Sequence, residues 1–281
     1  LENQPFYQIA HYDQMRPFFM TVVSDADHWL FISSNGGITA GRGDADHALF
    51  PYYADDKIRD MAGVTGSRTV LHARRGGRWF LWEPFADATR DVYRLQRNLY
   101  KSLWGNQLVF EEVNEDLKLT FRYAWCHSRE FGFVRRAWLR NTGAGSVRIR
   151  LLDGLQNLMP SGSTSQFNLE YSTLLDAYKK NELLPDTGLG LFRLSAIPVD
   201  RPEPAEALSA TVAWSLGLKP AHVLLSSTQL DRFRRGQSLA TETDVRAERG
   251  AYLVESTLTL RPGASLDWLI VADVNQGPCE V

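Results

Sequence analysis

Apolar and polar residues alternate along much of the chain, a pattern typical of half-buried β-strands. The clearest example is residues 117–125, in which every odd position is apolar and Lys118, Thr120 and Arg122 occupy even positions. A period of two places one row of side chains on a buried face and the other row toward water. Other stretches of strand character recur at residues 29–33, 69–73, 79–82, 133–141, 147–152, 189–197, 208–214, 252–260 and 266–272.

Segments that contain glycine or proline separate these strands and predict turns. Residues 74–77, Arg-Arg-Gly-Gly, and residues 261–263, Arg-Pro-Gly, each predict a hairpin, because each is a short turn segment between two strand patterns. Residues 142–145, Thr-Gly-Ala-Gly, predict a further turn that relies on glycine. Residues 201–204, Arg-Pro-Glu-Pro, predict a loop inside one domain, since strands resume soon after it.

Two segments have helical spacing instead. Residues 89–104 predict a short amphipathic helix, because apolar residues recur there at intervals of three and four: Val92, Leu95, Leu99 and Leu103. Residues 168–184 predict a second helix, with Ser165 as its N-cap. With roughly ten to fourteen strands and few helices, the sequence predicts an all-β antiparallel sandwich with one or two short helices. We expect it to form a single domain over residues 1–281.

Charge and composition narrow the classes of function. The chain has 31 basic and 33 acidic residues, so it lacks the positive excess of a dedicated nucleic-acid binder. Its hydrophobic content of 44% supports a sizeable core. No apolar run approaches the ~18 residues of a membrane span. We therefore expect neither nucleic acid nor a membrane as a partner.

The two cysteines, Cys126 and Cys279, cannot build a disulfide framework or a thiolate zinc site. Cys126 falls within a strand pattern and is expected to be a small buried apolar residue. The chain begins Leu-Glu-Asn-Gln, without Met or a signal-like segment, so we expect part of a longer protein and a cytoplasmic location. Motifs for a nucleophile elbow, a zinc protease or a phosphate loop are absent from the sequence, so we expect no cofactor, no metal and no catalytic residue.

The densest concentration of chemistry lies in residues 33–60. Four glycines fall within eight residues there, at positions 36, 37, 41 and 43, so the backbone can turn or approach a ligand closely. Aromatic, acidic and basic side chains follow, and this mixture suits a sugar, whose C–H face is apolar and whose rim carries hydroxyl groups. The candidate substrate-binding residues are Arg42, Asp46, His47, Tyr52, Tyr53, Asp55, Asp56 and Lys57.

Structural roles compete with this interpretation. Neighbouring carboxylates rarely span a glycosidic bond, and these acids can pair with nearby basic side chains. His47 can be a hydrogen-bonded structural residue, and Tyr52 and Tyr53 can pack in a core or a domain interface. A solvated or ion-paired strand face is expected for Arg135, Arg136 and Arg140. Core positions are expected for Trp29, Trp104, Trp125, Trp138, Trp214 and Trp268.

Three segments also resemble a known family. NGGITAGR (residues 35–42), DHALFPYYADDKI (46–58) and LLDAYKKNE (174–182) are similar to the N-terminal domain of cellobiose-phosphorylase-like proteins, of the glycosyltransferase family 36 type. The resemblance covers most of residues 20–275. It implies a galactose-mutarotase-like β-supersandwich that precedes an (α/α)6 barrel, and the barrel performs the chemistry. A chain of 281 residues has no room for that barrel.

The resemblance also implies a function for the longer protein: transfer or hydrolysis of glucosyl units of an oligosaccharide or β-glucan, with inorganic phosphate as co-substrate in a phosphorylase. This chain would pack against the missing barrel and shape its cleft, with a homodimer interface as a further role, and it would be inactive alone. Two alternatives stay open. One is a stand-alone carbohydrate-binding module; the other is an aldose-epimerase-like enzyme, which needs a histidine and an acid on one concave face. His72, His127 and Glu83 are its candidates.

Overall fold

The computed structural model describes residues 4–197 and 207–281, and strands dominate them. The strands are β1 (Phe6–Ala10), β2 (Phe19–Thr21), β3 (His28–Ser33), β4 (Ile38–Arg42), β5 (Ala48–Phe50), β6 (Gly66–Arg75), β7 (Arg78–Trp82), β8 (Leu95–Ser102), β9 (Leu108–Asn114), β10 (Leu119–Ser128), β11 (Gly132–Asn141), β12 (Val147–Leu158), β13 (Lys179–Leu184), β14 (Leu189–Leu194), β15 (Ala210–Leu216), β16 (His222–Leu224), β17 (Asp244–Arg246), β18 (Gly250–Leu260) and β19 (Ser265–Gln276). The α-helices are α1 (Asp55–Asp60), α2 (Ser165–Glu170), α3 (Ser172–Tyr178) and α4 (Leu230–Arg234). Single 3-10 turns are η1 (Tyr12–Gln14), η2 (Met61–Gly63) and η3 (Asp87–Thr89).

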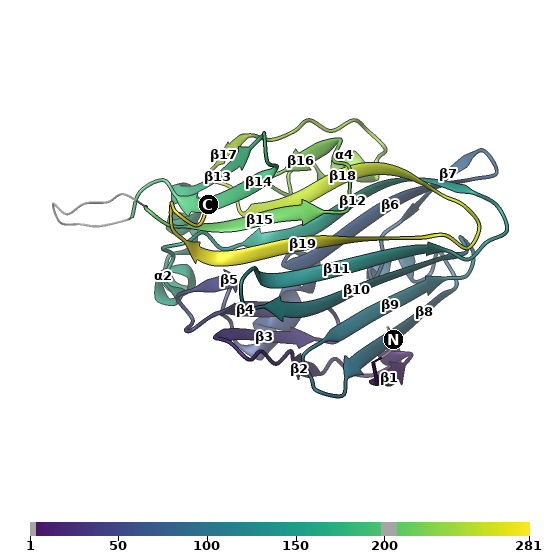
Figure 1. Ribbon diagram of the computed structural model, residues 1–281, viewed down its shortest axis with the longest axis horizontal. Coiled ribbons are helices and arrows are strands. Elements are labelled where there is room, and N and C mark those ends of the chain that lie inside the picture. Colours follow the sequence, from purple (N-terminus) through teal and green to yellow (C-terminus); the bar gives the residue numbers. More distant parts are fainter. Residues whose placement is uncertain (1–3, 198–206) are drawn as a thin grey trace.

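The strands form three antiparallel sheets (Figure 1). The ten-stranded sheet has the order β1-β8-β9-β10-β11-β19-β15-β14-β13-β17. The five-stranded sheet has the order β16-β18-β12-β6-β7, and the four-stranded sheet the order β2-β3-β4-β5. The five-stranded sheet packs on the ten-stranded one through β12 on β11 and β7 on β9, where buried side chains bond across the two layers.

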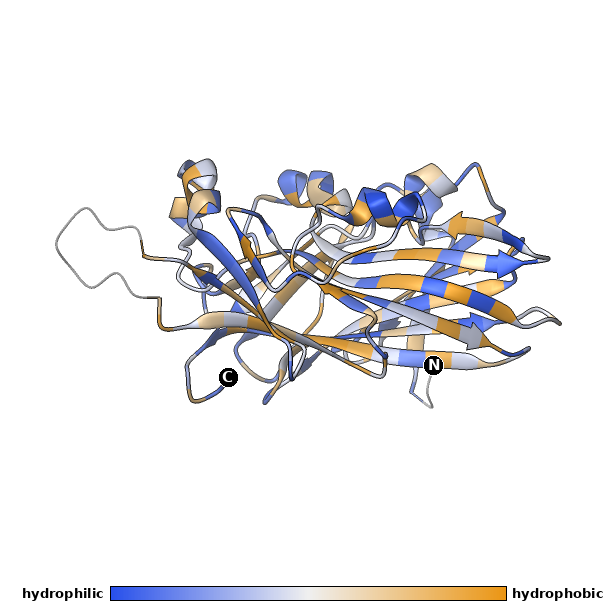
Figure 2. Ribbon diagram, turned by 90° about the horizontal axis from the view of Figure 1, so that it is seen from above, coloured by the Kyte–Doolittle hydropathy of each residue, from blue (hydrophilic) through white to orange (hydrophobic). Residues whose placement is uncertain are grey.

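The core lies between these layers. On β10 the predicted alternation holds: Phe121, Tyr123 and Trp125 are buried on the inner face, while Thr120 and Arg122 are partly exposed. Figure 2 shows such alternating apolar and polar bands along the strands, with the short helices gathered along one side of the sandwich. Each buried apolar side chain contributes about 1.5–3 kcal/mol to stability. The predicted all-β antiparallel sandwich is confirmed, although the described residues contain four short helices instead of one or two.

The predicted helix over residues 89–104 is wrong. Residues 95–102 form β8, which pairs with β1 and β9. Leu95, Leu99 and Leu103 are spaced by four, which also satisfies a period of two. Between them lies Arg97, which is 5% exposed and bonds the buried Glu112. A charged residue therefore occupies a core position of this strand, and the apolar residues that remain have helical spacing.

The predicted helix over residues 168–184 is correct only in its first part. Residues 165–178 form α2 and α3, and residues 179–184 form the strand β13. The N-cap of α2 is Thr164, whose Oγ1 accepts a hydrogen bond from the Phe167 N–H; Ser165 is the first helical residue instead of the cap. The Pro-rich loop at residues 201–204 lies outside the described residues.

One of the two predicted hairpins is confirmed. β6 and β7 pair across residues 76 and 77. β18 and β19 do not pair: β18 belongs to the five-stranded sheet and β19 to the ten-stranded one, so residues 261–264 cross between layers. Asn141 supports this crossing, because its amide group donates to the carbonyls of Leu260 and Arg261.

Several side chains do not lie where the pattern placed them. Of the six tryptophans expected in the core, Trp125 and Trp268 are buried, and Trp104 is 63% exposed. Cys126 is half-buried. Arg135 is completely buried between the sheets, where it pairs with Asp153 of β12. Of the two expectations for this strand face, Arg135 therefore meets the ion-paired one and not the solvated one.

Candidate functional site

The glycine-rich block folds into the four-stranded sheet and α1. Gly41 on β4 lies directly opposite Trp29 on β3, and a Cβ at Gly41 would collide with the indole ring. A Cβ at Gly37 would collide with the backbone carbonyl of Ile58 in α1. These two glycines are therefore explained by close packing inside the protein, without a ligand.

Two predicted site residues, one at the end of β4 and one directly before β5, are engaged by other side chains. Arg42 forms ion pairs with Asp27 at 3.0 Å and with Asp273 of β19 at 2.8 Å. It thereby ties the four-stranded sheet to the ten-stranded one. His47 Nδ1 lies 2.8 Å from the carboxylate of Asp44, which is the structural role considered as the alternative.

The next predicted residues contact one another and α2. Asp46 accepts hydrogen bonds at 2.7 Å from both the backbone N–H and the hydroxyl of Ser165. The Tyr53 hydroxyl accepts one from Asn168, and the ammonium group of Lys57 lies 5.4 Å from the centre of the Tyr53 ring. The structure thus brings residues 46–57 together, and most of their polar groups bond within the protein.

The remaining three predicted site residues are two acids that bond within α1 and one exposed tyrosine. Asp55 pairs with Arg59 one helical turn later, at 3.1 Å. Asp56 accepts from the backbone N–H of Lys57. Tyr52 is 46% exposed and meets Trp29 edge-on at 5.6 Å between ring centres. Tyr52 is therefore the predicted residue that offers an aromatic surface to solvent.

A cleft of about 1000 Å³ lies between the four-stranded and five-stranded sheets. Residues 34–36 of the β3–β4 turn form one wall, and β7 with residues 83–93 forms the other. The side chains of Tyr123 and Arg97 come from the ten-stranded sheet beneath. Among the described residues that line this cleft, none is one of the eight predicted site residues. Its volume is at the upper end of the range for small-molecule sites.

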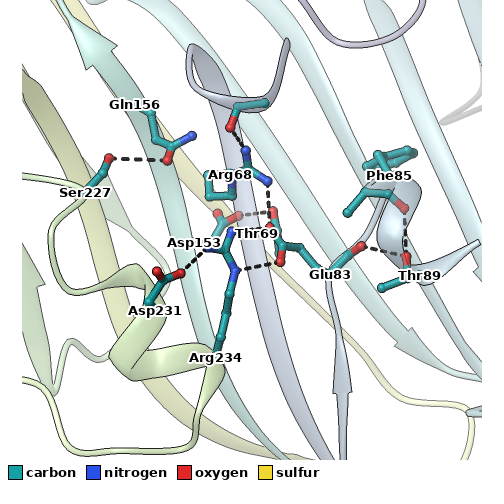
Figure 3. Close-up of polar contacts among 12 residues, drawn as sticks. Arg68, Thr69, Glu83, Phe85, Thr89, Asp153, Gln156, Ser227, Asp231 and Arg234 are labelled. Atoms are coloured by element: carbon teal, nitrogen blue, oxygen red, sulfur yellow. Dashed lines mark hydrogen bonds and ion pairs between the residues drawn. The ribbon is translucent and has the colours of Figure 1, made fainter. Parts of the chain in front are cut away.

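Two arginines converge on one carboxylate in this cleft (Figure 3). Arg68 of β6 donates to Glu83 Oε1 at 2.6 Å. Arg234 of α4 donates to both oxygens of Glu83, at 3.0 and 2.8 Å. Arg234 also bonds Asp231 at 2.7 Å, and Arg68 bonds the carbonyl of Gly63. This Arg68–Glu83–Arg234 cluster fixes three planar polar groups in one wall.

The arginines keep Glu83 ionised. Burial opposes its charge, but hydrogen bonds and charge from Arg234 and Arg68 outweigh burial, so the pKa of Glu83 is lowered. The hydrogen bond to Glu83 raises the pKa of Arg234. Burial, together with the nearby charge of Arg234, lowers the pKa of Arg68. A carboxylate held in this way is suited to binding and orienting a ligand, and poorly suited to donating a proton.

A buried carboxylate holds the loop after β7 in place. Glu112 of β9 accepts from Trp82 Nε1, from the backbone N–H of Phe85 and from Arg97 Nε, all at 2.7–2.8 Å. Phe85 has φ of +65°, a backbone conformation that costs a non-glycine residue of order 1–3 kcal/mol. Such strain persists where surrounding contacts impose it, and here it shapes the wall of the cleft.

The cleft also exposes aromatic surface. Trp79 of β7 is 48% exposed, and Phe80 and Tyr93 also line the cleft. Arg74 lies 5.9 Å from the centre of the Trp79 ring. Trp82, three positions later, is completely buried, so the two tryptophans lie on opposite faces of β7. An exposed ring beside fixed polar groups is an arrangement that can hold a sugar.

Little in the local sequence indicates this cluster. Glu83 entered the prediction only as a partner for a histidine. Arg68 and Glu83 are 15 residues apart, and Arg234 is 151 residues from Glu83. The exposed Trp79 followed by an acid at the end of the same hairpin was the one local signal.

The histidines considered for an epimerase lie elsewhere. His72 is buried, and its Nε2 lies 2.7 Å from the carbonyl oxygen of Phe233. His127 stacks on His28 at 5.1 Å between ring centres. No histidine lines the cleft among the described residues, so Glu83 has no histidine partner there.

Comparisons with known proteins find solved structures that align with this chain at TM-scores below 0.5. No protein-family model matches the sequence, and neither does any curated protein. Among solved structures, a polysaccharide lyase aligns with a TM-score of 0.46 and 9% identity, over 94% of this chain and 33% of that one. A bacterial glucoamylase in complex with acarbose aligns with a TM-score of 0.41 and 11% identity, over 98% of this chain and 36% of that one.

A protein described as an aldose 1-epimerase from Escherichia coli K12 aligns with a TM-score of 0.43 and 11% identity, over 92% of this chain and 99% of that one. The chain therefore spans about a third of the lyase and the glucoamylase and nearly all of the epimerase. Likeness at these scores carries no argument about substrate or reaction. The resemblance to cellobiose-phosphorylase-like proteins gains no support from these comparisons and stays a prediction.

Within the described part of the chain, no group of three or more histidine, cysteine or acidic side chains is arranged to hold a metal ion. No helix in that part of the chain has the length and apolar character to cross a membrane.

Proposed function

We propose that this chain is a carbohydrate-binding domain of a larger carbohydrate-active enzyme, and that the cleft beside β7 holds a neutral oligosaccharide. The observation that carries the proposal is the combination of exposed Trp79 with the Arg68–Glu83–Arg234 cluster in one cleft. An indole face packs against the C–H face of a pyranose, and fixed arginine and carboxylate groups bond its hydroxyls. The volume of about 1000 Å³ favours several sugar units over one.

A neutral ligand is favoured because the charges of the cleft are already paired. Arg90 bonds Asp13 at 3.2 Å, and Arg97 bonds the buried Glu112 at 2.7 Å. Glu83 is shared by two arginines, one of which also bonds Asp231. An anionic ligand would have to displace one of these carboxylates from its arginine.

We propose that the chemistry belongs to another part of the parent protein. A general acid for glycosidic bond cleavage needs a raised pKa, and that of Glu83 is lowered. Following the sequence resemblance, we assign catalysis to an (α/α)6 barrel that packs on this domain, with inorganic phosphate as its co-substrate and an oligosaccharide or β-glucan as its substrate. The predicted block at residues 42–57, with exposed Tyr52, is proposed as a second sugar-contacting surface, and a homodimer as a further assembly.

Calorimetric titration with cellobiose and cellopentaose tests the binding proposal. Trp79→Ala should weaken binding about two- to thirteenfold, because an aromatic contact contributes about 0.5–1.5 kcal/mol. Trp104→Ala is the matched control, since Trp104 is exposed but does not line the cleft. Failure of both sugars to bind, or equal binding by the wild type and Trp79→Ala, would contradict the proposal.

A second experiment tests the division of labour. The parent protein should release glucose 1-phosphate from cellobiose in the presence of phosphate, and residues 1–281 alone should not. Turnover of any sugar by residues 1–281 alone would overturn the non-catalytic role and favour the epimerase-like alternative.

A further inference from the structure

The hairpin that borders the cleft has a defined hydrogen-bonding pattern. β6 and β7 are joined by Gly76 and Gly77, with φ of +53° and +80°. Two consecutive residues with positive φ form a type I′ turn, in which the flanking residues, here Arg75 and Arg78, exchange backbone hydrogen bonds. In an antiparallel pair, hydrogen-bonded and non-hydrogen-bonded positions alternate from that point.

This alternation decides which backbone groups of β7 face away from β6. Phe80 lies opposite Ala73 at a hydrogen-bonded position, whereas Trp79 and Leu81 lie at non-hydrogen-bonded positions. The N–H and C=O groups of Trp79 and Leu81 therefore point outward. An independent contact agrees: the hydroxyl of Tyr93 donates to the Leu81 carbonyl at 2.6 Å from outside the sheet.

β7 is the last strand of its sheet, so no neighbouring strand covers these groups. Within the described residues, three of them have no backbone partner from a turn or loop: the N–H and C=O of Trp79 and the N–H of Leu81. Trp79 and Leu81 both line the cleft, and both are partly exposed. The cleft thus has two free donors and one free acceptor along a single strand edge.

We infer that this edge of β7 is a saccharide subsite, in which one sugar ring stacks on Trp79 and its hydroxyls bond the three free backbone groups. The inference rests on the proposed function and specifies where in the cleft the neutral sugar lies. Hydroxyl groups suit the edge because each can donate or accept. A continuous β-strand suits it less, because Tyr93 occupies the Leu81 carbonyl and interrupts the ladder after Trp79.

Amide hydrogen exchange followed by NMR tests the inference directly. In the free protein the amides of Trp79 and Leu81 should exchange rapidly, and that of Phe80 should be protected by its bond to β6. Near-saturating cellopentaose should slow exchange at Trp79 and Leu81 by at least about tenfold, while Phe80 changes little. Maltopentaose, run in parallel, reports whether linkage matters.

A backbone substitution provides the second test. Leu81→Pro removes an N–H that points away from β6 and takes no part in the ladder, and an edge strand tolerates such a proline. Leu81→Ala is the matched control, because it shortens the side chain and keeps the N–H. Leu81→Pro should bind cellopentaose about tenfold more weakly than Leu81→Ala, the equivalent of one hydrogen bond. Thermal unfolding establishes that both variants are folded, and the exchange experiment stands without them.

The outcomes separate this inference from the proposed function. Binding that depends on Trp79, with no protection of the Trp79 and Leu81 amides, would overturn the subsite and leave the proposed function intact. Absence of binding by both sugars would overturn both. Protection of the same amides on raising the protein concentration without sugar would indicate strand addition between copies of the chain, and would also overturn the subsite.

Discussion

Replacing His127 by Phe should remove a defined part of the acid sensitivity of the fold. His127 on β10 stacks on His28 at 5.1 Å with the rings 23° apart, and it meets Phe133 edge-on at 5.3 Å. Burial, and then the charge of His28, lower the pKa of His127 to about 4. Phenylalanine keeps the aromatic contacts and cannot take up a proton.

The sign and size of the effect follow from proton linkage. The pKa of an unfolded histidine is about 6.5, so between about pH 6.5 and pH 4 the unfolded chain binds a proton at His127 that the folded protein does not. The contribution of His127 to stability is therefore lost as the pH falls through this window. With these two pKa values, the wild type should lose about 2 kcal/mol relative to His127→Phe between about pH 7 and pH 5.

Urea unfolding of both proteins at several pH values measures this difference. Above about pH 7 the free energies of unfolding of the two proteins should differ by a constant amount. Toward pH 5 that of the wild type should fall relative to that of His127→Phe. An NMR titration of the His127 ring provides the folded pKa independently. Parallel stability curves down to pH 5, or a ring that titrates near 6.5, would refute the argument.

Three further substitutions test the packing. Trp82→Ala should cost about 3–5 kcal/mol in urea unfolding, because it empties a fully buried site. Arg135→Met should cost about 3–5 kcal/mol by leaving Asp153 buried without its partner, and adding Asp153→Leu should recover part of this loss; no recovery would argue against a buried ion pair. Gly41→Ala should lower the unfolding free energy by roughly 1–3 kcal/mol, whereas Gly145→Ala, which meets open space at an ordinary φ, should be neutral by the same assay.

Most strands could be predicted because their inner faces are apolar and their outer faces polar. The failures coincide with charges inside the sandwich. Arg97 occupies an inner position of β8 and pairs with Glu112, and Arg135 occupies an inner position of β11 and pairs with Asp153. A pattern of apolar and polar letters cannot distinguish a buried, paired arginine from a solvated one, because the partner lies on another strand.

The pairing of strands was the second feature that the sequence pattern could not predict. The segments at residues 74–77 and 261–263 look alike in sequence, yet one closes a hairpin and the other crosses between two sheets. Local turn chemistry fixes the bend in the chain. Which strand lies beside which depends on contacts across the whole sandwich, such as those of Asn141 with residues 260 and 261.

The kinds of side chain in the candidate site could be predicted from the sequence, but the residues that form it could not. Residues 33–60 concentrate glycines and aromatic rings, and the structure accounts for Gly37 and Gly41 by close packing against α1 and Trp29. The cleft instead draws on side chains from separate parts of the chain, with Arg234 reaching Glu83 across 151 residues. No spacing rule in one sequence can join such groups.

The position of the cleft follows from the mismatch among the three sheets. The four-stranded sheet meets the inner face of β10 where Phe50 contacts Trp125. The five-stranded sheet covers the same face of the ten-stranded sheet, through the bond of Trp82 to β9 and the bond of Arg135 to β12. The two smaller sheets share that face without pairing with each other, so the region where they fail to meet is left open above Tyr123.

A ligand in this cleft would contact all three sheets at once. It should therefore stabilise the whole sandwich against unfolding, by a free energy that rises with the logarithm of the ligand concentration above the Kd. A sugar that raised the Tm of the wild type more than that of Trp79→Ala would link the open region, the exposed indole and the fold in one measurement.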